Sequence, residues 1–190
     1  MDLLKERIRL DGKVLNNDIL KVDSFINHQI DCELMSKIGE DFAEHFKDFG
    51  ITKVVTIESS GIAPAFSVAS ILKVPLVIFK KQTSKILDED LLQTEVFSFT
   101  KGTSYQLTAS RKFLDSSDKI LFIDDFLANG EAGLGASRII KMAGANLCGI
   151  GIVIEKSFQA GRAKLEGLGV PVYSLARIKA FNNGKLEFLD

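Results

Sequence analysis

The sequence predicts an α/β fold with a mostly parallel, twisted sheet flanked by helices on both faces. Short apolar runs alternate with amphipathic stretches through the middle of the chain, which is the order expected of parallel strands joined by helices. A length of 190 residues and a hydrophobic content of 46% suit one domain. Only three prolines are present and no stiff linker is visible, so we expect a single domain over residues 1–190.

The first half of this pattern is read from apolar spacing. Between residues 31 and 49, apolar side chains recur at every fourth position and predict a helix that Gly50 ends: Leu34, Ile38, Phe42 and Phe46. The run 53–57 predicts a buried strand, and a turn and a helix over 63–72 follow it. Residues 74–79 predict a second strand.

The second half begins with a different kind of segment. Residues 80–110 are polar and then alternate in character around Lys101 and Gly102, which predicts a flexible loop carrying a β-hairpin. The elements expected after it are a strand over 120–123, a helix over 131–143, a strand over 147–154, a short helix near 159–168, a strand over 170–178, and a tight turn at 182–184 leading into 185–189. Ligands in such folds gather at the carboxyl ends of the strands.

Composition excludes several classes of protein. The 24 basic and 25 acidic residues give a net charge of -1, without the basic excess typical of nucleic-acid binders. The charged N-terminus lacks the core of a signal peptide, and no apolar run approaches the ~20 residues of a membrane span. We therefore expect a cytoplasmic protein. Cys32 and Cys148 are too few for a disulfide scaffold, and their apolar neighbours predict buried, inert thiols.

Residues 120–132 carry the most specific signal in the chain. Four apolar residues lead to Asp124 and Asp125, and two further apolar residues precede a turn of small residues that enters a helix. Carboxylates at the end of a strand accept hydrogen bonds from ribose hydroxyls, and the turn lets backbone N–H groups and the helix dipole approach a phosphate. An ordinary strand-turn-helix corner with capping acids is the alternative. Two adjacent acids after an apolar strand favour a phosphorylated-ribose site.

This segment resembles the phosphoribosyl diphosphate signature of the type I phosphoribosyltransferases. Residues 16–31, the Glu58-Ser59-Ser60-Gly61 turn and residues 154–158 extend the resemblance over the whole chain, to the xanthine phosphoribosyltransferases. The resemblance implies transfer of a phosphoribosyl group to xanthine in purine salvage, with Mg²⁺ bound mainly through phosphoribosyl diphosphate. It also implies a homodimer, and a small hood formed by about residues 1–30 with the C-terminal hairpin.

The resemblance further implies roles for individual residues. The loop that holds the 5′-phosphate would be formed by Ala128, Asn129, Gly130, Glu131 and Ala132. The catalytic acids at the ribose hydroxyls would be Asp124 and Asp125. The pyrophosphate would be wrapped by a loop with an unusual peptide, formed by Ser59, Ser60 and Gly61, and its charge offset by Lys80 and Lys81. A solvated lysine pair is the alternative for the last two. Leu20 and Asn27 would contact the base.

Two residues bear on which base is bound. Hypoxanthine-guanine enzymes usually carry an aspartate at the position of Ala128, so the alanine disfavours that assignment. Lys156 follows an apolar strand and should emerge at the ligand end of the sheet. Its ammonium has three donors and no acceptor, which suits the carbonyls of an oxopurine. The alternative is a surface lysine paired with Glu155.

Other interpretations remain open. Phe158 could stack on a purine or belong to the core. Residues 82–104 could form a lid over the site, and Tyr105 could lie on that lid. No role is assigned to His28 or His45. A regulator that senses phosphoribosyl diphosphate is a second function, although it would need a DNA-binding extension or a basic face. A transferase for another base is a third, and the donors of Lys156 would meet the amino group of adenine badly.

Overall fold

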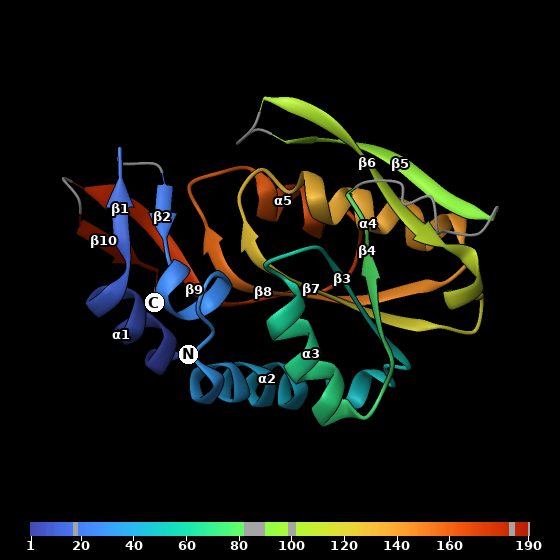
Figure 1. Cartoon of the computed structure of the whole chain (residues 1–190), viewed down its shortest axis with the longest axis horizontal. Helices are drawn as coiled ribbons and strands as arrows, with labels where there is room; N and C mark the ends of the chain where they lie inside the picture. The colour runs from blue at the N-terminus through green and yellow to red at the C-terminus, as the bar shows by residue number, and fades with distance from the viewer. Residues whose placement is uncertain (17–18, 82–89, 99–101, 183–184, 190) are drawn as a thin grey trace.

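The computed structural model describes residues 1–16, 19–81, 90–98, 102–182 and 185–189. Its centre is a six-stranded sheet in the order β10-β9-β8-β7-β3-β4 (Figure 1). All neighbouring strands are parallel except β9 and β10. The strands are β3 (Lys53–Ile57), β4 (Leu76–Phe79), β7 (Lys119–Leu127), β8 (Asn146–Lys156), β9 (Val172–Asn182) and β10 (Lys185–Phe188). The predicted fold class is confirmed.

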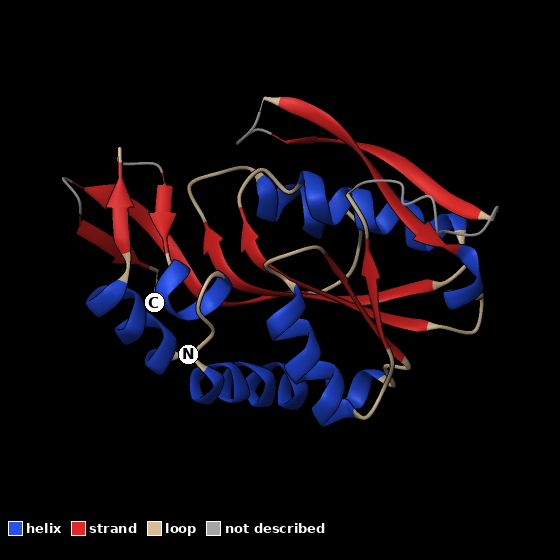
Figure 2. Ribbon diagram, in the orientation of Figure 1, coloured by secondary structure: helices blue, strands red, loops and turns tan. Residues whose placement is uncertain are grey.

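Helices cover both faces of this sheet (Figure 2). On one face lie α2 (Cys32–Phe46) and α3 (Ile62–Leu72), and on the other α4 (Glu131–Met142) and α5 (Gly161–Glu166). The buried side chains form two clusters accordingly, one around Phe42 and Val68 and one around Ile139 and Leu165. Because apolar residues cover both faces, the central strands are buried and their carboxyl ends form the accessible edge.

The helix over residues 31–49 formed as expected. Asp31 caps it by accepting a hydrogen bond from the Leu34 N–H at 3.1 Å. Its four predicted apolar residues are all buried: Leu34, Ile38, Phe42 and Phe46. A 3-10 turn over Lys47–Phe49 ends at Gly50, whose φ of 63° is a conformation that glycine adopts at low cost.

A separate hairpin of β5 (Leu91–Ser98) and β6 (Thr103–Ser110) lies over α4 (Figure 1). It packs so closely that a Cβ at Gly135 would lie 2.4 Å from the Val96 side chain. Arg138 of α4 also donates to Thr94 Oγ1 at 2.8 Å. The hairpin was predicted, but residues 82–89 and 99–101 of the proposed lid lie outside the described residues, as does the first residue of the predicted turn at Lys101 and Gly102.

The N-terminal segment packs beside the C-terminal hairpin. It contains α1 (Asp2–Asp11), β1 (Lys13–Leu15), β2 (Ile19–Lys21) and a π-helical turn (Asp23–Asn27). The Met1 ammonium donates to the Leu175 carbonyl at 2.9 Å, and the Arg9 guanidinium lies 4.9 Å from the ring centroid of Phe188. The expectations did not include α1, although Leu4 and Ile8 are four residues apart and both fully buried. Of the predicted turn at 182–184, residues 183 and 184 lie outside the described residues, and Asn182 is the last residue of β9.

Several expectations need correction. The strand predicted over 120–123 continues to Leu127, and the one predicted over 147–154 continues to Lys156, because each gains hydrogen bonds from its neighbour along this length. The cysteines are not buried: Cys32 is exposed at the first turn of α2, and Cys148 is half-buried. None of the helices within the described ranges combines the length and the apolar character that a membrane span requires.

Candidate active site

The site begins where β7 outruns its neighbour β3. Pairing between the two strands ends at Phe122, whereas pairing with β8 continues to Leu127. Asp124 and Asp125 therefore lie within the strand, at the part of it that β3 no longer covers. Asp124 is only 8% exposed, and its Oδ1 accepts a hydrogen bond from the Asp125 N–H at 3.1 Å. Burial raises the pKa of both carboxyls, and the charge of Asp125 raises that of Asp124 further.

The next residues form a loop of small side chains. Gly130 has a φ of 83° and stands at the N-terminus of α4, where no side chain caps the helix. The amides of the first turn are therefore available to an anion, and the helix dipole favours one there. The side chain of Glu131 is held by Lys164 at 2.6 Å. This ion pair offsets a negative charge that would otherwise repel a phosphate.

A second loop approaches the acids from the end of β3. The peptide bond between Glu58 and Ser59 is cis, as an unusual peptide was expected here. Gly61 precedes α3, and a Cβ at this position would lie 2.3 Å from Thr56 Oγ1 and 3.0 Å from Asp124 Oδ1. Only glycine lets the backbone come this close to the buried acid.

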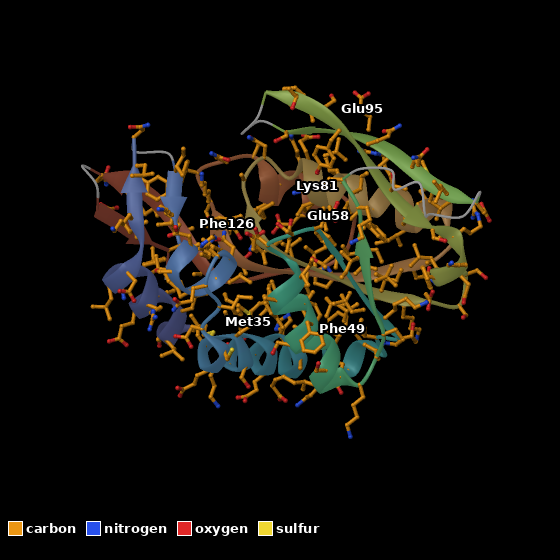
Figure 3. The ribbon with its side chains drawn as sticks, in the orientation of Figure 1. Met35, Phe49, Glu58, Lys81, Glu95 and Phe126 are labelled. Carbon is orange, nitrogen blue, oxygen red and sulfur yellow. The ribbon has the colours of Figure 1, made fainter. Side chains whose placement is uncertain are left out.

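The two adjacent lysines have different surroundings. Lys81 lies 5.8 Å from the ring centroid of Tyr105, and its charge lowers the pKa of both aspartates, by less than burial raises it. Lys80 pairs with Glu58 at 3.3 Å. Glu58 also accepts a hydrogen bond from the Lys81 backbone N–H at 2.7 Å, so its side chain fixes the backbone that follows β4 (Figure 3).

Both aspartates, the small-residue loop, Ser60 and Lys81 line one cavity of about 640 Å³. Of the predicted site residues, those on its wall are Leu20, Ser60, Lys81, Asp124, Asp125, Ala128, Asn129, Gly130, Glu131, Ala132 and Lys156. Those outside its lining are Asn27, which is exposed at the end of the π-helical turn, and Ser59, Gly61 and Lys80. Lys80 lines a separate cavity beside β4.

Residues from β8 and from the N-terminal segment complete the lining of this cavity. Lys156 is the last residue of β8 and is half-buried, with its Nζ 5.9 Å from the ring centroid of Phe181. Leu20 of β2 is 5% exposed and reaches the same cavity from the N-terminal segment. Phe126 and Ile152 line it too, and sequence reasoning missed both (Figure 3). Phe126 directly follows the two acids in the sequence, and this position could have identified it as a residue of the site.

Two residues near Lys156 in the sequence, Phe158 and Glu155, bear on the alternatives that the sequence left open. Phe158 is 45% exposed and packs edge-on against Phe181 at 5.4 Å, outside the residues that line the cavity. Glu155 is fully buried among Arg162, Arg177, Ser157 and Ser174. Glu155 therefore has partners other than Lys156, and Lys156 is half-buried rather than fully exposed.

Comparison with known proteins places this geometry in a family. The chain is 58% identical to the xanthine phosphoribosyltransferase of Agathobacter rectalis over 190 residues, which is 100% of this chain and 99% of the relative. It is 57% identical to that of Clostridium acetobutylicum over 189 residues, covering 100% of both chains. The chain belongs to the xanthine phosphoribosyltransferase family. No family model matches it.

Solved structures agree with this membership at the level of the fold. The adenine phosphoribosyltransferase of Giardia lamblia, determined with 9-deazaadenine, superposes with a TM-score of 0.78 over 92% of this chain and 97% of its own, at 22% identity. The adenine enzyme of Rhodothermus marinus gives a TM-score of 0.76 over 93% and 99%, also at 22% identity. The xanthine phosphoribosyltransferase family thus shares its fold with enzymes for another purine.

Proposed function

We propose that the chain transfers the 5-phosphoribosyl group from 5-phospho-α-D-ribose 1-diphosphate to xanthine, giving xanthosine 5′-monophosphate and diphosphate in purine salvage. The observation that carries the proposal is that one cavity is lined by the small-residue loop, the two aspartates and Lys156. A nucleotide needs these three kinds of group in one place, for its phosphate, its ribose and its base. Family membership supports the same reaction.

The ribose-phosphate half follows from the chemistry of the loop. Residues 128–132 would hold the 5′-phosphate through backbone N–H groups and the dipole of α4. Asp124 and Asp125 would accept hydrogen bonds from the ribose hydroxyls. Ser60 and Lys81 line the cavity beside them and would face the pyrophosphate. The roles expected of Ser59, Gly61 and Lys80 stay predictions.

The reaction replaces the bond between the anomeric carbon and pyrophosphate with a bond to a purine nitrogen. Positive charge develops on the ribose ring in a loose transition state, as in glycoside chemistry. The two aspartates line the cavity in which that ring would lie, and their burial would strengthen their electrostatic effect. Catalysis therefore rests on positioning and charge, with no protein nucleophile required.

The residues present also fit magnesium. Mg²⁺ prefers oxygen ligands and is commonly bound through one or two carboxylates together with substrate phosphates. Asp124 and Asp125 provide such oxygens, and a nearby cation would offset the burial that raises the pKa of both. No group of three or more metal-binding side chains occurs within the described ranges, so phosphoribosyl diphosphate would supply the remaining ligands. Bound there, the ion would stabilise the charge of the leaving pyrophosphate.

The base would occupy the part of the cavity that Lys156 lines. Leu20, Phe126 and Ile152 provide apolar surface for a flat ring, and Lys156 provides hydrogen-bond donors for its carbonyls. Xanthine has two carbonyls, whereas adenine presents an amino group that a lysine cannot accept from. A contact between Asn27 and the base stays a prediction.

The larger arrangement is also part of the proposal. We propose that about residues 1–30 and the C-terminal hairpin act as a hood over the base, which fits their mutual packing and the place of Leu20. Closure of 82–104 over the substrates stays a prediction that protection from proteolysis by phosphoribosyl diphosphate would support. The homodimer stays a prediction that light scattering would test, and the cytoplasmic location stays one that cell fractionation would test.

A panel of bases tests the function directly. Xanthine, guanine, hypoxanthine and adenine are each supplied with phosphoribosyl diphosphate and Mg²⁺, and the nucleotide is measured by chromatography. We expect the highest kcat/KM with xanthine and the lowest with adenine. A preference for adenine would overturn the role of Lys156. The absence of turnover with every base would favour a regulator that binds phosphoribosyl diphosphate.

A further inference from the structure

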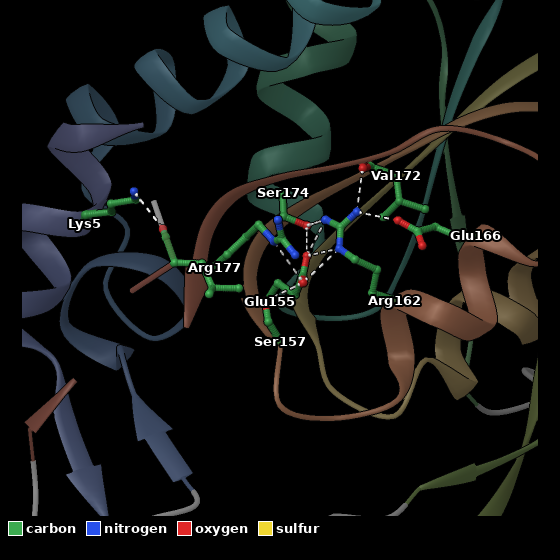
Figure 4. Close-up of polar contacts among 9 residues, drawn as sticks. Lys5, Glu155, Ser157, Arg162, Glu166, Val172, Ser174 and Arg177 are labelled. Atoms are coloured by element: carbon green, nitrogen blue, oxygen red, sulfur yellow. Dashed lines mark hydrogen bonds and ion pairs between the residues drawn. The ribbon is translucent and has the colours of Figure 1, made fainter. Parts of the chain in front are cut away.

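Glu155 is a buried charge immediately before the proposed base-binding lysine. It is fully buried at the end of β8 and accepts hydrogen bonds from groups on three other segments (Figure 4). Ser157 donates to it at 2.5 Å, and Arg177 of β9 at 3.2 Å. Arg162 of α5 donates through Nε at 2.9 Å and through a second nitrogen at 2.5 Å. Because a buried carboxylate is costly without such partners, this end of β8 is held in one place.

Arg162 holds more than the carboxylate. Its other contacts are with the Val172 carbonyl at 3.1 Å, the Ser174 hydroxyl at 3.1 Å and Glu166 at 3.0 Å. A planar guanidinium can satisfy several partners in fixed directions, whereas a lysine ammonium cannot reproduce that geometry. The Arg162 side chain thus joins α5 to the carboxyl end of β8 and to the beginning of β9.

The opposite side of α5 contacts the phosphate loop. The Gly161 N–H donates to the Ala128 carbonyl at 3.0 Å, and Lys164 pairs with Glu131 at 2.6 Å. Leu165 is fully buried and sits so close to Gly133 that a Cβ there would lie 2.8 Å from it. The helix is therefore fixed to the loop by a hydrogen bond and an ion pair, and to the first turn of α4 by apolar packing.

We propose that Arg162 is a positioning residue that couples the base subsite to the phosphate subsite through α5. Lys156 is set in place by Glu155 next to it, Glu155 is set by Arg162, and α5 carries the connection to the loop over 128–132. The two ends of a nucleotide have a fixed separation, so both bind well together only if the subsites keep that separation. This inference rests on the proposed function.

The coupling is tested with ligands that occupy one subsite or both. Ribose 5-phosphate reaches only the phosphate end, whereas xanthosine 5′-monophosphate reaches both. In Arg162→Lys, calorimetry should show xanthosine monophosphate binding at least about 10-fold more weakly, because a small misplacement of one subsite is costly. Ribose 5-phosphate should bind within about 2-fold of the wild-type affinity, since the contacts of Gly161 and Lys164 remain. Glu166→Gln is the control, because Glu166 is exposed and its carboxylate accepts from a different nitrogen of Arg162 than the two that hold Glu155.

Each outcome decides a different question. Equal affinities of the wild type and Arg162→Lys for the nucleotide, or equal weakening of both ligands, would overturn the coupling. If Arg162→Lys does not fold, Ser174→Ala removes one hydroxyl from the same network and should show the same selective loss at about 2-fold to 5-fold. If the panel of bases selects a purine other than xanthine, the proposed function fails, and the coupling is measured with the nucleotide of that purine.

Discussion

Replacing Glu155 by glutamine removes a charge from the interior and leaves its shape unchanged. Burial alone would raise the pKa of this carboxyl, but hydrogen bonds from Arg162, Ser157 and Ser174 and the charge of Arg162 lower it from the ordinary 4.5 to about 2. Glutamine keeps one acceptor oxygen and leaves Arg162 and Arg177 without the negative charge they surround. We therefore expect Glu155→Gln to fold with a large loss of stability.

The magnitude follows from the pKa. At about 1.4 kcal/mol per pH unit, the fall from 4.5 to about 2 corresponds to ~3 kcal/mol of stability at pH 7. The sign is that of a carboxyl with a lowered pKa: its contribution is complete above pH 4.5 and is lost as the pH falls towards 2. At pH 3 the same relation leaves ~1.4 kcal/mol. The difference between wild type and variant should therefore shrink with acidification.

Urea unfolding followed by circular dichroism measures this difference at pH 7, 5 and 3. Glu166→Gln serves as the control, since it removes an exposed partner of the same arginine and should cost less than about 0.5 kcal/mol. A loss below about 1 kcal/mol in Glu155→Gln at pH 7, or a loss that is the same at every pH, would refute the assignment of stability to the buried charge.

Three further changes probe the site itself. Lys156→Ala should raise KM for xanthine by about 10-fold or more in steady-state assays, with little change for phosphoribosyl diphosphate, since a charged hydrogen bond is lost; the reverse pattern would move Lys156 out of the base subsite. Gly161→Ala places a methyl 2.3 Å from the Ala128 carbonyl and should raise KM for phosphoribosyl diphosphate by about 10-fold; an unchanged KM would show that the loop tolerates displacement. Asp124→Asn should lower kcat by about 100-fold and raise the urea midpoint at pH 8, because burial raises the pKa of this carboxyl and its ionised form is unfavourable there; a lower midpoint would contradict this account.

The sequence was sufficient where the site is local. Residues 120–132 run consecutively from strand to turn to helix, so their order alone places two acids beside a loop of small residues. The structure extends the strand to Leu127, and both acids line the cavity beyond Phe122, where β3 stops pairing. A strand's own sequence does not state where its neighbour ends.

Contacts between residues far apart in the sequence could not be predicted from the spacing of apolar residues. Glu155 stands beside Lys156 in the sequence, which suggested a surface pair. In the structure its partners come from α5 and β9, at Arg162, Ser174 and Arg177, and they make burial of the charge possible. Apolar periodicity identifies which residues are buried with the core, but it does not identify which charged residues find partners there.

The conformation of the loop over residues 128–132 depends on a residue outside that segment, Gly161. Gly130 adopts a φ of 83°, and a Cβ on it would lie 3.0 Å from the Cα of Gly161. A Cβ on Gly161 would in turn lie 2.3 Å from the carbonyl of Ala128. The two backbones are therefore in contact, and a side chain on either would separate them. The sequence of residues 128–132 therefore does not by itself determine the position of this loop. α5 fixes that position through the hydrogen bond between Gly161 and Ala128, and Arg162 of the same helix is hydrogen-bonded to Glu155, on the strand that carries Lys156.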